Sequence, residues 1–317
     1  MDTITHGLIG ALAAKAGFYQ KTGRVATVAL TVGAVFPDID IATSFLGSDF
    51  ALRYPRGITH SVSAAPFFAI LLSSIIYRLS SFKNLRFLIL MIALGIYSHI
   101  FFDLITSYGT VIFDPLSMKR YSWNLVFILD PFITLPVLIG LILAWRKKET
   151  AFKVSIIVFT FLSLYLLVCL HTRDVSSERL AEFAKKRSFD VIKSSVYPRP
   201  LAPFFWMGVI ETKDSFYKLN LNLVEIDIGD FQEIRKPKDN YFIELAKGLD
   251  AVKLYLWFAD FPVTLYKNEG KDHIVAFYDL RFSFIPDKTP FLLKVVFDEK
   301  GSLRNISLDG RFVKERF

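Results

Sequence analysis

Residues 87–105, FLILMIALGIYSHIFFDLI, form an unbroken apolar run that carries one histidine and one aspartate. The run approaches the roughly 20 residues with which an α-helix crosses a bilayer. His99 and Asp103 are four residues apart, so on a helix they share one face, with Cβ atoms about 5–6 Å apart. Ionisable groups are costly inside a membrane and usually face the interior of a helix bundle or a watery cavity. The run therefore predicts a transmembrane helix with a polar site near its end.

Other apolar runs extend this prediction to the whole first half of the chain, at 62–77, 125–145 and 152–171, with shorter runs at 7–18 and 25–36. The composition agrees, because 53% of the 317 residues are hydrophobic and 32 are Phe. Such a content of apolar residues excludes a disordered chain. A single cysteine, Cys169, excludes an internal disulfide and a metal cluster held by cysteines.

The charges predict how the chain is oriented in the membrane. Residues 1–171 hold 14 Lys/Arg and 8 Asp/Glu, whereas residues 172–317 hold 24 and 22, so the basic excess lies in the apolar half. This distribution favours a membrane protein over a nucleic-acid-binding one. Basic loops fall at one set of helix ends, and histidines and aspartates fall at the opposite ends. By the positive-inside rule, we expect a multi-pass protein of the inner cell membrane whose His/Asp face and C-terminal part are extracytoplasmic.

The second half has a different pattern. Ser176 and Ser177 precede an expected short helix at 179–186, with a serine as its N-cap. Stretches rich in β-branched and aromatic residues predict strands at 204–211, 216–225, 252–258, 273–284, 291–297 and 303–308. The expected fold is therefore multi-domain: an all-α transmembrane bundle over 1–171 with a metal site at its outer end, and a soluble α+β domain with an antiparallel sheet over 172–317.

Further polar motifs lie at the same predicted face of the bundle. Pro37 should end the preceding helix at Phe36. If Asp38-Ile39-Asp40 is extended, both carboxylates point to one side. They would then share a metal, or one would bind metal while the other orients a ligand histidine. The alternative is an acidic turn that only terminates the helix.

Two motifs complete the candidate site. Arg56 and His60 belong to the segment RGITHS at 56–61, and Arg56 would grip a phosphate or carboxylate through paired hydrogen bonds or extend along the membrane interface. Together three histidines and three aspartates are candidate metal ligands: His6, Asp38, Asp40, His60, His99 and Asp103. These donors suit one divalent ion, or two that share a carboxylate, with zinc as the first expectation and manganese or iron as alternatives.

The same motifs carry a family resemblance. Residues 2–7 (DTITHG), 36–40 (FPDID), 56–61 (RGITHS) and 98–106 (SHIFFDLIT) resemble the YdjM-type integral-membrane proteins. The resemblance is strongest over about residues 1–145 and implies a metal-dependent hydrolase. More distantly, the pattern is similar to the zinc-dependent phospholipase C and P1 nuclease group, whose third metal uses a second His-x-x-x-Asp pair that this chain lacks. Three residues are candidate substitutes for that pair: Asp114, Asp130 and His171.

The sequence thus predicts a membrane-bound, metal-dependent hydrolase of phosphoesters, acting on a lipid headgroup or a lipid-linked phosphate at the outer membrane surface. Asp38, Asp40, Arg56 and Asp103 are the expected catalytic residues. The bilayer and such a substrate are the expected partners; nucleic acid is not, and the sequence leaves the oligomeric state open. Two alternatives remain, a non-enzymatic membrane scaffold or envelope-stress protein with a structural His/Asp cluster, and an ion or proton pathway.

Overall fold

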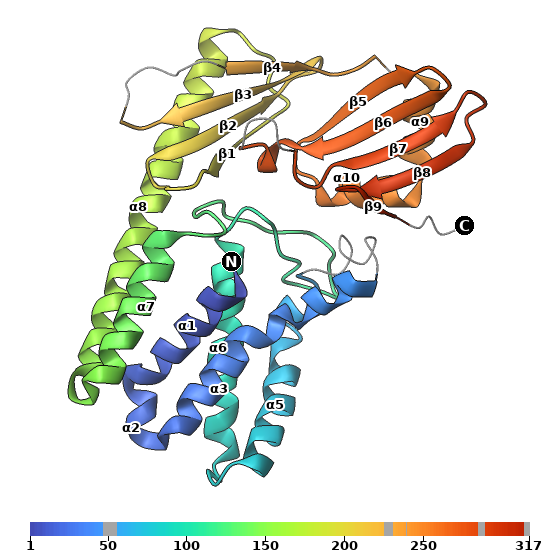
Figure 1. Ribbon diagram of the computed structural model, residues 1–317. Coiled ribbons are helices and arrows are strands. Elements are labelled where there is room, and N and C mark those ends of the chain that lie inside the picture. Colours follow the sequence, from blue (N-terminus) through green and yellow to red (C-terminus); the bar gives the residue numbers. More distant parts are fainter. Residues whose placement is uncertain (47–55, 225–230, 239, 285–288, 314–317) are drawn as a thin grey trace. The chain divides into compact units, whose positions relative to one another are not determined.

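A computed structural model describes residues 1–46, 56–224, 231–238, 240–284 and 289–313. They divide into two compact units (Figure 1). The first consists mainly of Met1–Asp40 and Arg56–Arg173, and the second mainly of Asp174–Arg199 and Phe204–Phe317. The first unit is helical and the second contains two antiparallel sheets. This confirms the predicted order along the chain, a helical region followed by a domain with antiparallel sheet structure.

The helical unit begins with short helices and ends with long ones. Its elements are α1 (Thr3–Ala13), η1 (Ala14–Phe18), α2 (Tyr19–Thr22), α3 (Arg24–Val35), η2 (Phe36–Leu46), η3 (Ile58–His60), α5 (Ala65–Leu79), α6 (Leu85–Leu104), α7 (Pro131–Arg146), η4 (Lys148–Thr150) and α8 (Ala151–Lys186). The last residues of α8 belong to the second unit.

Close packing of α3 on α6 forms the centre of the helical unit. A Cβ atom added at Gly95 would lie 2.7 Å from the carbonyl oxygen of Leu30, and one at Gly33 would lie 2.4 Å from that of Ile92. Only glycine at these positions lets the two backbones approach so closely. The approach places the end of α3 beside the polar end of α6.

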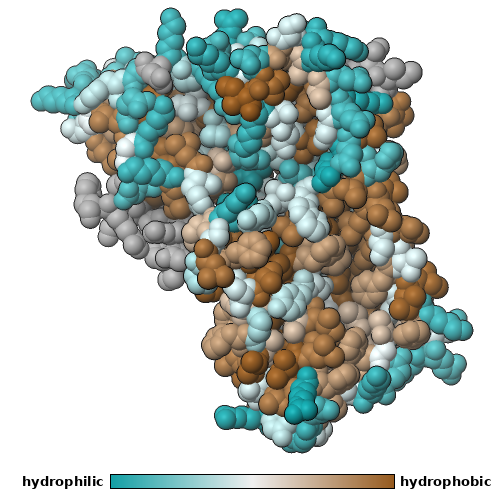
Figure 2. Space-filling view, turned by 180° about the vertical axis from the view of Figure 1, so that it is seen from behind, coloured by the Kyte–Doolittle hydropathy of each residue, from teal (hydrophilic) through white to brown (hydrophobic). Residues whose placement is uncertain are grey.

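Two helices, Leu85–Leu104 and Lys148–Lys186, are long and apolar enough to cross a membrane. Helices α5 and α7 are apolar but shorter. At 1.5 Å per residue, α1 and α3 are each about 17 Å long, against a hydrocarbon core of roughly 30 Å. Figure 2 shows hydrophobic side chains over much of the helical unit, with hydrophilic ones gathered at one end of it.

The end of α3 agrees with its sequence, but the segment that follows does not. Helix α3 ends at Val35, just before the Phe36-Pro37 pair that predicted its end. The condition of an extended Asp38-Ile39-Asp40 is not met, because these residues continue in the 3₁₀ helix η2. The fixed φ of Pro37 is compatible with the first turn of a helix, so proline ended α3 without ending helical structure.

The second unit contains a four-stranded sheet, in the order β1-β2-β3-β4, and a five-stranded sheet, in the order β5-β6-β7-β8-β9. All neighbouring strands are antiparallel. The strands are β1 (Lys193–Pro198), β2 (Phe205–Glu211), β3 (Ser215–Asn222), β4 (Phe231–Arg235), β5 (Pro262–Glu269), β6 (Asp272–Asp279), β7 (Leu293–Asp298), β8 (Leu303–Leu308) and β9 (Arg311–Phe312). Helices α9 (Tyr241–Gly248) and α10 (Asp250–Phe258) precede β5 along the chain, and the short helix η5 (Leu280–Phe282) follows β6.

Three local predictions for this half were wrong. The stretch 252–258 is helix α10, because its buried residues Val252, Tyr255 and Phe258 recur at helical spacing. The predicted strand 273–284 stops at Asp279, whose side chain caps the short helix η5. No new helix starts at the serine pair, because α8 runs through it to Lys186. Part of the predicted strand 216–225 lies outside the described residues.

Candidate metal centre

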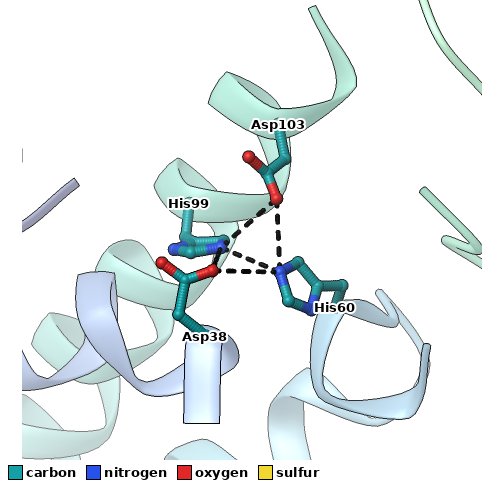
Figure 3. A group of neighbouring side chains, drawn as sticks. All are labelled: Asp38, His60, His99 and Asp103. Carbon is teal, nitrogen blue, oxygen red and sulfur yellow. Dashed lines mark hydrogen bonds and ion pairs between the residues drawn. The ribbon is translucent and has the colours of Figure 1, made fainter. Parts of the chain in front are cut away.

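Four side chains from three segments of the chain converge inside the helical unit: Asp38, His60, His99 and Asp103 (Figure 3). One ligand atom from each lies within 4.8 Å of all the others. Both histidines and Asp103 are fully buried, and the side chain of Asp38 is 10% exposed. Such a group of imidazole nitrogens and carboxylate oxygens has the composition of a transition-metal site.

The convergence follows from the packing of the helices. His99 and Asp103 occupy successive turns on one face of α6. The close approach of α3 to α6 brings the carbonyl oxygen of Ala34 within 2.7 Å of His99 Nδ1. Because η2 continues the helical path, Asp38 comes one turn later and its Oδ1 lies 3.5 Å from His99 Nε2. The segment containing η3 brings His60 to face Asp38 and His99 from the other side (Figure 3).

The partners of each histidine determine which ring nitrogen carries its proton. A carbonyl oxygen only accepts, so His99 Nδ1 donates to Ala34 and His99 Nε2 is left with a lone pair. His60 Nδ1 lies 3.2 Å from Asp40 Oδ2, which likewise favours a proton on Nδ1. The two Nε2 atoms lie 3.0 Å apart. Two lone pairs repel at that distance unless a proton or a metal ion lies between them. Metal-bound histidines typically donate from the ring nitrogen that does not bind the metal to a backbone carbonyl or a carboxylate, as the Nδ1 atoms do here.

The two carboxylate oxygens of Asp103 have different contacts. The backbone amine of Met1, the ring of His6 and the guanidinium of Arg56 all contact Oδ1, with 3.2 Å to His6 Nε2 and 2.9 Å to an Arg56 nitrogen. Oδ2 is buried without a hydrogen bond and lies 3.2 Å from His60 Nε2. A buried acceptor without a hydrogen bond is unfavourable. A cation held between Oδ2 and the two imidazoles would satisfy it, so the residues fit a metal ion.

Asp40 and Arg56 lie beside the four-residue group rather than in it. Asp40 Oδ2 accepts a hydrogen bond from the backbone N–H of Arg56 at 2.7 Å. The same oxygen lies 3.2 Å from His60 Nδ1. This corresponds to the second of the two predicted arrangements, in which one aspartate reaches the metal position and the other orients a histidine. The Arg56 guanidinium binds Asp103, donates to Thr106 and lies 4.7 Å from the centre of the Tyr108 ring.

The remaining predicted residues differ in position. The ring of His6 stacks on that of His99, with centroids 3.7 Å apart, so His6 packs against the group without being one of the four. The three candidates for a third metal lie elsewhere. Asp130 caps α7 and accepts from Tyr165, Asp114 is contacted through its backbone carbonyl, and His171 is exposed on α8. The described residues thus contain one cluster of this kind.

Several contacts of the site were not predicted from the sequence. Thr3 donates its hydroxyl to Asp38, Thr59 donates to Asp40, and the amine of Met1 reaches Asp103. The threonines stand inside the motifs DTITHG and RGITHS, so their spacing from the histidines was a usable signal. The backbone amine and the carbonyl of Ala34 have no side-chain signal, and only the fold reveals them.

Comparison with known proteins agrees with this picture. A model of the YdjM inner membrane protein family matches residues 1–173, which include the whole His/Asp group. The chain is also similar to the uncharacterized protein YfhP of Bacillus subtilis (strain 168), with 26% identity over 296 residues that cover 89% of this chain and 87% of that protein. No solved structure matches the chain. Since the family model covers more than half of its length, the chain belongs to the YdjM inner membrane protein family.

Proposed function

We propose that this protein is a metal-dependent hydrolase of the inner membrane that cleaves phosphoesters of lipid headgroups or lipid-linked phosphates at the outer membrane surface. One observation carries the proposal: two histidine Nε2 atoms, 3.0 Å apart, share a buried space with oxygens of two carboxylates. In this proposal Asp38, His60, His99 and Asp103 hold the ion, with zinc as the first expectation.

The neighbouring residues suit phosphoester hydrolysis. A divalent ion at this position supplies Lewis acidity, which activates water and polarises the phosphoryl oxygen. Arg56 has donors besides those it gives to Asp103 and Thr106, and these can stabilise charge that develops on phosphate. Asp40 holds the ring of His60 in place. Ile4, Ile39 and Ile58 come from the same segments as these residues and are 48–74% exposed, which suits a substrate with an apolar part.

Metal analysis of the purified chain tests the first half of the proposal. After loading with zinc or manganese and removal of excess, we expect bound metal in the wild type and its loss in His99→Ala. His171→Ala is the matched control, because that histidine is exposed on α8, outside the group. Absence of bound metal in the loaded wild type contradicts the proposal.

Hydrolysis of phospholipid and lipid-linked phosphate in mixed micelles tests the second half. We expect phosphate or headgroup release by the metal-loaded wild type and by His171→Ala, but not by Asp103→Asn. The alternative function is a non-enzymatic scaffold, in which a proton lies between the two histidines and the cluster only joins segments. That function is supported if His99→Ala lowers the stability of the helical unit while the wild type binds no metal.

A further inference from the structure

The second unit contains an open cavity of about 760 Å³, whose lining includes the end of β4 and the start of β5. Its walls come from the turn between β2 and β3, from these two strands, and from α9 and α10. Sites for small molecules usually have volumes of about 300–1,000 Å³. The cavity is therefore large enough for a small organic ligand.

Part of the lining is apolar. Phe216 is 3% exposed and Ile243 1% exposed, so both are held firmly by the packing of this unit. Leu256 of α10 and Pro262 of β5 add further apolar surface to the cavity. Carbon atoms of a ligand would be covered by these side chains, because most binding pockets combine an apolar lining with a few polar groups.

The polar part of the lining is mainly basic. The cavity is lined by five cationic side chains and three carboxylates, which are Lys213, Arg235, Lys236, Lys238 and Lys247 against Glu211, Asp214 and Glu233. The lining therefore has a formal excess of two positive charges, and one of its cations, Lys247, also pairs with Glu244 outside the lining at 2.8 Å. This excess is local, because residues 172–317 as a whole hold nearly equal numbers of acidic and basic side chains.

Two of the carboxylates are already engaged within the protein. Glu211 lies 2.7 Å from Lys236 Nζ, and Glu233 accepts a hydrogen bond from Ser215. By contrast, none of the described residues forms an ion pair with Lys213 or Lys238. These two exposed lysines are therefore available to an anion in the cavity.

We propose that this cavity binds a small organic phosphate, with the phosphate at the lysines and the carbon skeleton against the apolar lining. A phosphate monoester carries close to two negative charges at neutral pH, which matches the excess on the lining. Lysine binds phosphate as a point charge, and Arg235 can add paired hydrogen bonds. The site lies in the other unit from the His/Asp group, and binding there needs no metal.

Calorimetric titration of the purified full chain with phenyl phosphate tests the proposal. A chelator in the buffer prevents any metal at the His/Asp group from contributing to the measured heat of binding. We expect saturable binding in the wild type and an affinity at least about tenfold lower in the double variant Lys213→Ala, Lys238→Ala, because two charge-assisted contacts with the phosphate are lost. Lys271→Ala, in the turn between β5 and β6 and outside the lining, should bind as the wild type does.

Acylation of lysines, measured by mass spectrometry, gives a second readout that locates the ligand without a variant. Phenyl phosphate should protect Lys213 and Lys238 and leave Lys271 reactive, and phenol should protect none of them. Equal binding by the double variant and the wild type, equal binding of phenol, or absence of protection would each overturn the proposal. Asp103→Asn should still bind, so the outcome here is independent of the hydrolase proposal.

Discussion

Asp38 and Asp40 are separated by one residue, yet their surroundings predict different roles. Asp38 Oδ1 faces both Nε2 atoms, at 3.5 Å from His99 and 3.7 Å from His60. Asp40 instead lies beside the other ring nitrogen of His60, Nδ1, at 3.2 Å. We expect Asp38→Asn to abolish metal binding, and Asp40→Asn to weaken it by about 10–100-fold, as is typical for residues that orient a metal-bound histidine. Equilibrium titration with zinc measures both, and equal losses in the two variants would contradict this assignment.

A second prediction for single residues concerns Asp260 in the second unit. Its carboxylate contacts Lys193 and accepts a hydrogen bond from Tyr197. Burial acts to raise the pKa of Asp260, but these partners and Arg281 outweigh it and lower the pKa below 3.8. A carboxylate with a lowered folded pKa stabilises the fold above its unfolded pKa, and this stabilisation is lost as pH falls through the folded pKa.

We therefore expect Asp260→Asn to lower the free energy of unfolding of the second unit at neutral pH and to flatten its decline below about pH 4. Urea unfolding, followed by the fluorescence of the buried Trp206, measures both effects. Lys253→Ala is a suitable control, since its ion pair with Asp250 is exposed on both sides. The prediction fails if Asp260→Asn and the wild type lose stability in parallel as the pH falls.

At the scale of elements, the contact between α3 and α6 controls the site. Gly95→Ala places a methyl group against the carbonyl oxygen of Leu30 and the backbone nitrogen of Ala34. We expect a loss of about 1–3 kcal/mol in stability, together with less bound metal, because the carbonyl of Ala34 must move away from His99. Gly248→Ala is the matched control, as nothing lies within 4 Å of its added carbon. Thermal unfolding and metal content are the measurements, and unchanged values for Gly95→Ala would show that the contact is not needed.

Long elements and side-chain motifs were the parts that the sequence predicted well. Helix α6 follows from its apolar run, and β8 has the bounds expected from its residues. All six predicted ligand residues lie in or beside one cluster, because polar side chains are rare in an apolar bundle and their motifs recur at helix ends. Helix α10 was misread because its sequence, DAVKLYLWF, combines a helical period with residues that favour strands. The different roles of Asp38 and Asp40 depended on the path of η2, which local sequence does not determine.

At the scale of the whole molecule, the positions of the charges along the bundle predict its orientation in the membrane. Helix α3 begins at Arg24 and is followed at its other end by Asp38, and α6 runs from the basic segment at Lys83 and Arg86 to Asp103. Basic loops and the His/Asp group thus occupy opposite ends of the same helices. Because short basic loops usually stay in the cytoplasm, we expect the His/Asp group to open toward the outer surface.

Cysteine labelling in intact cells tests this orientation. Cys169 is buried, so it contributes little background. We expect a membrane-impermeant maleimide to label Asn268→Cys, at the exposed end of β5, before the cells are permeabilised. Ser81→Cys, between α5 and α6, and Lys148→Cys, before α8, should react only afterwards. The reverse pattern would place the His/Asp group on the cytoplasmic side, and the proposed substrate would then have to come from the inner leaflet.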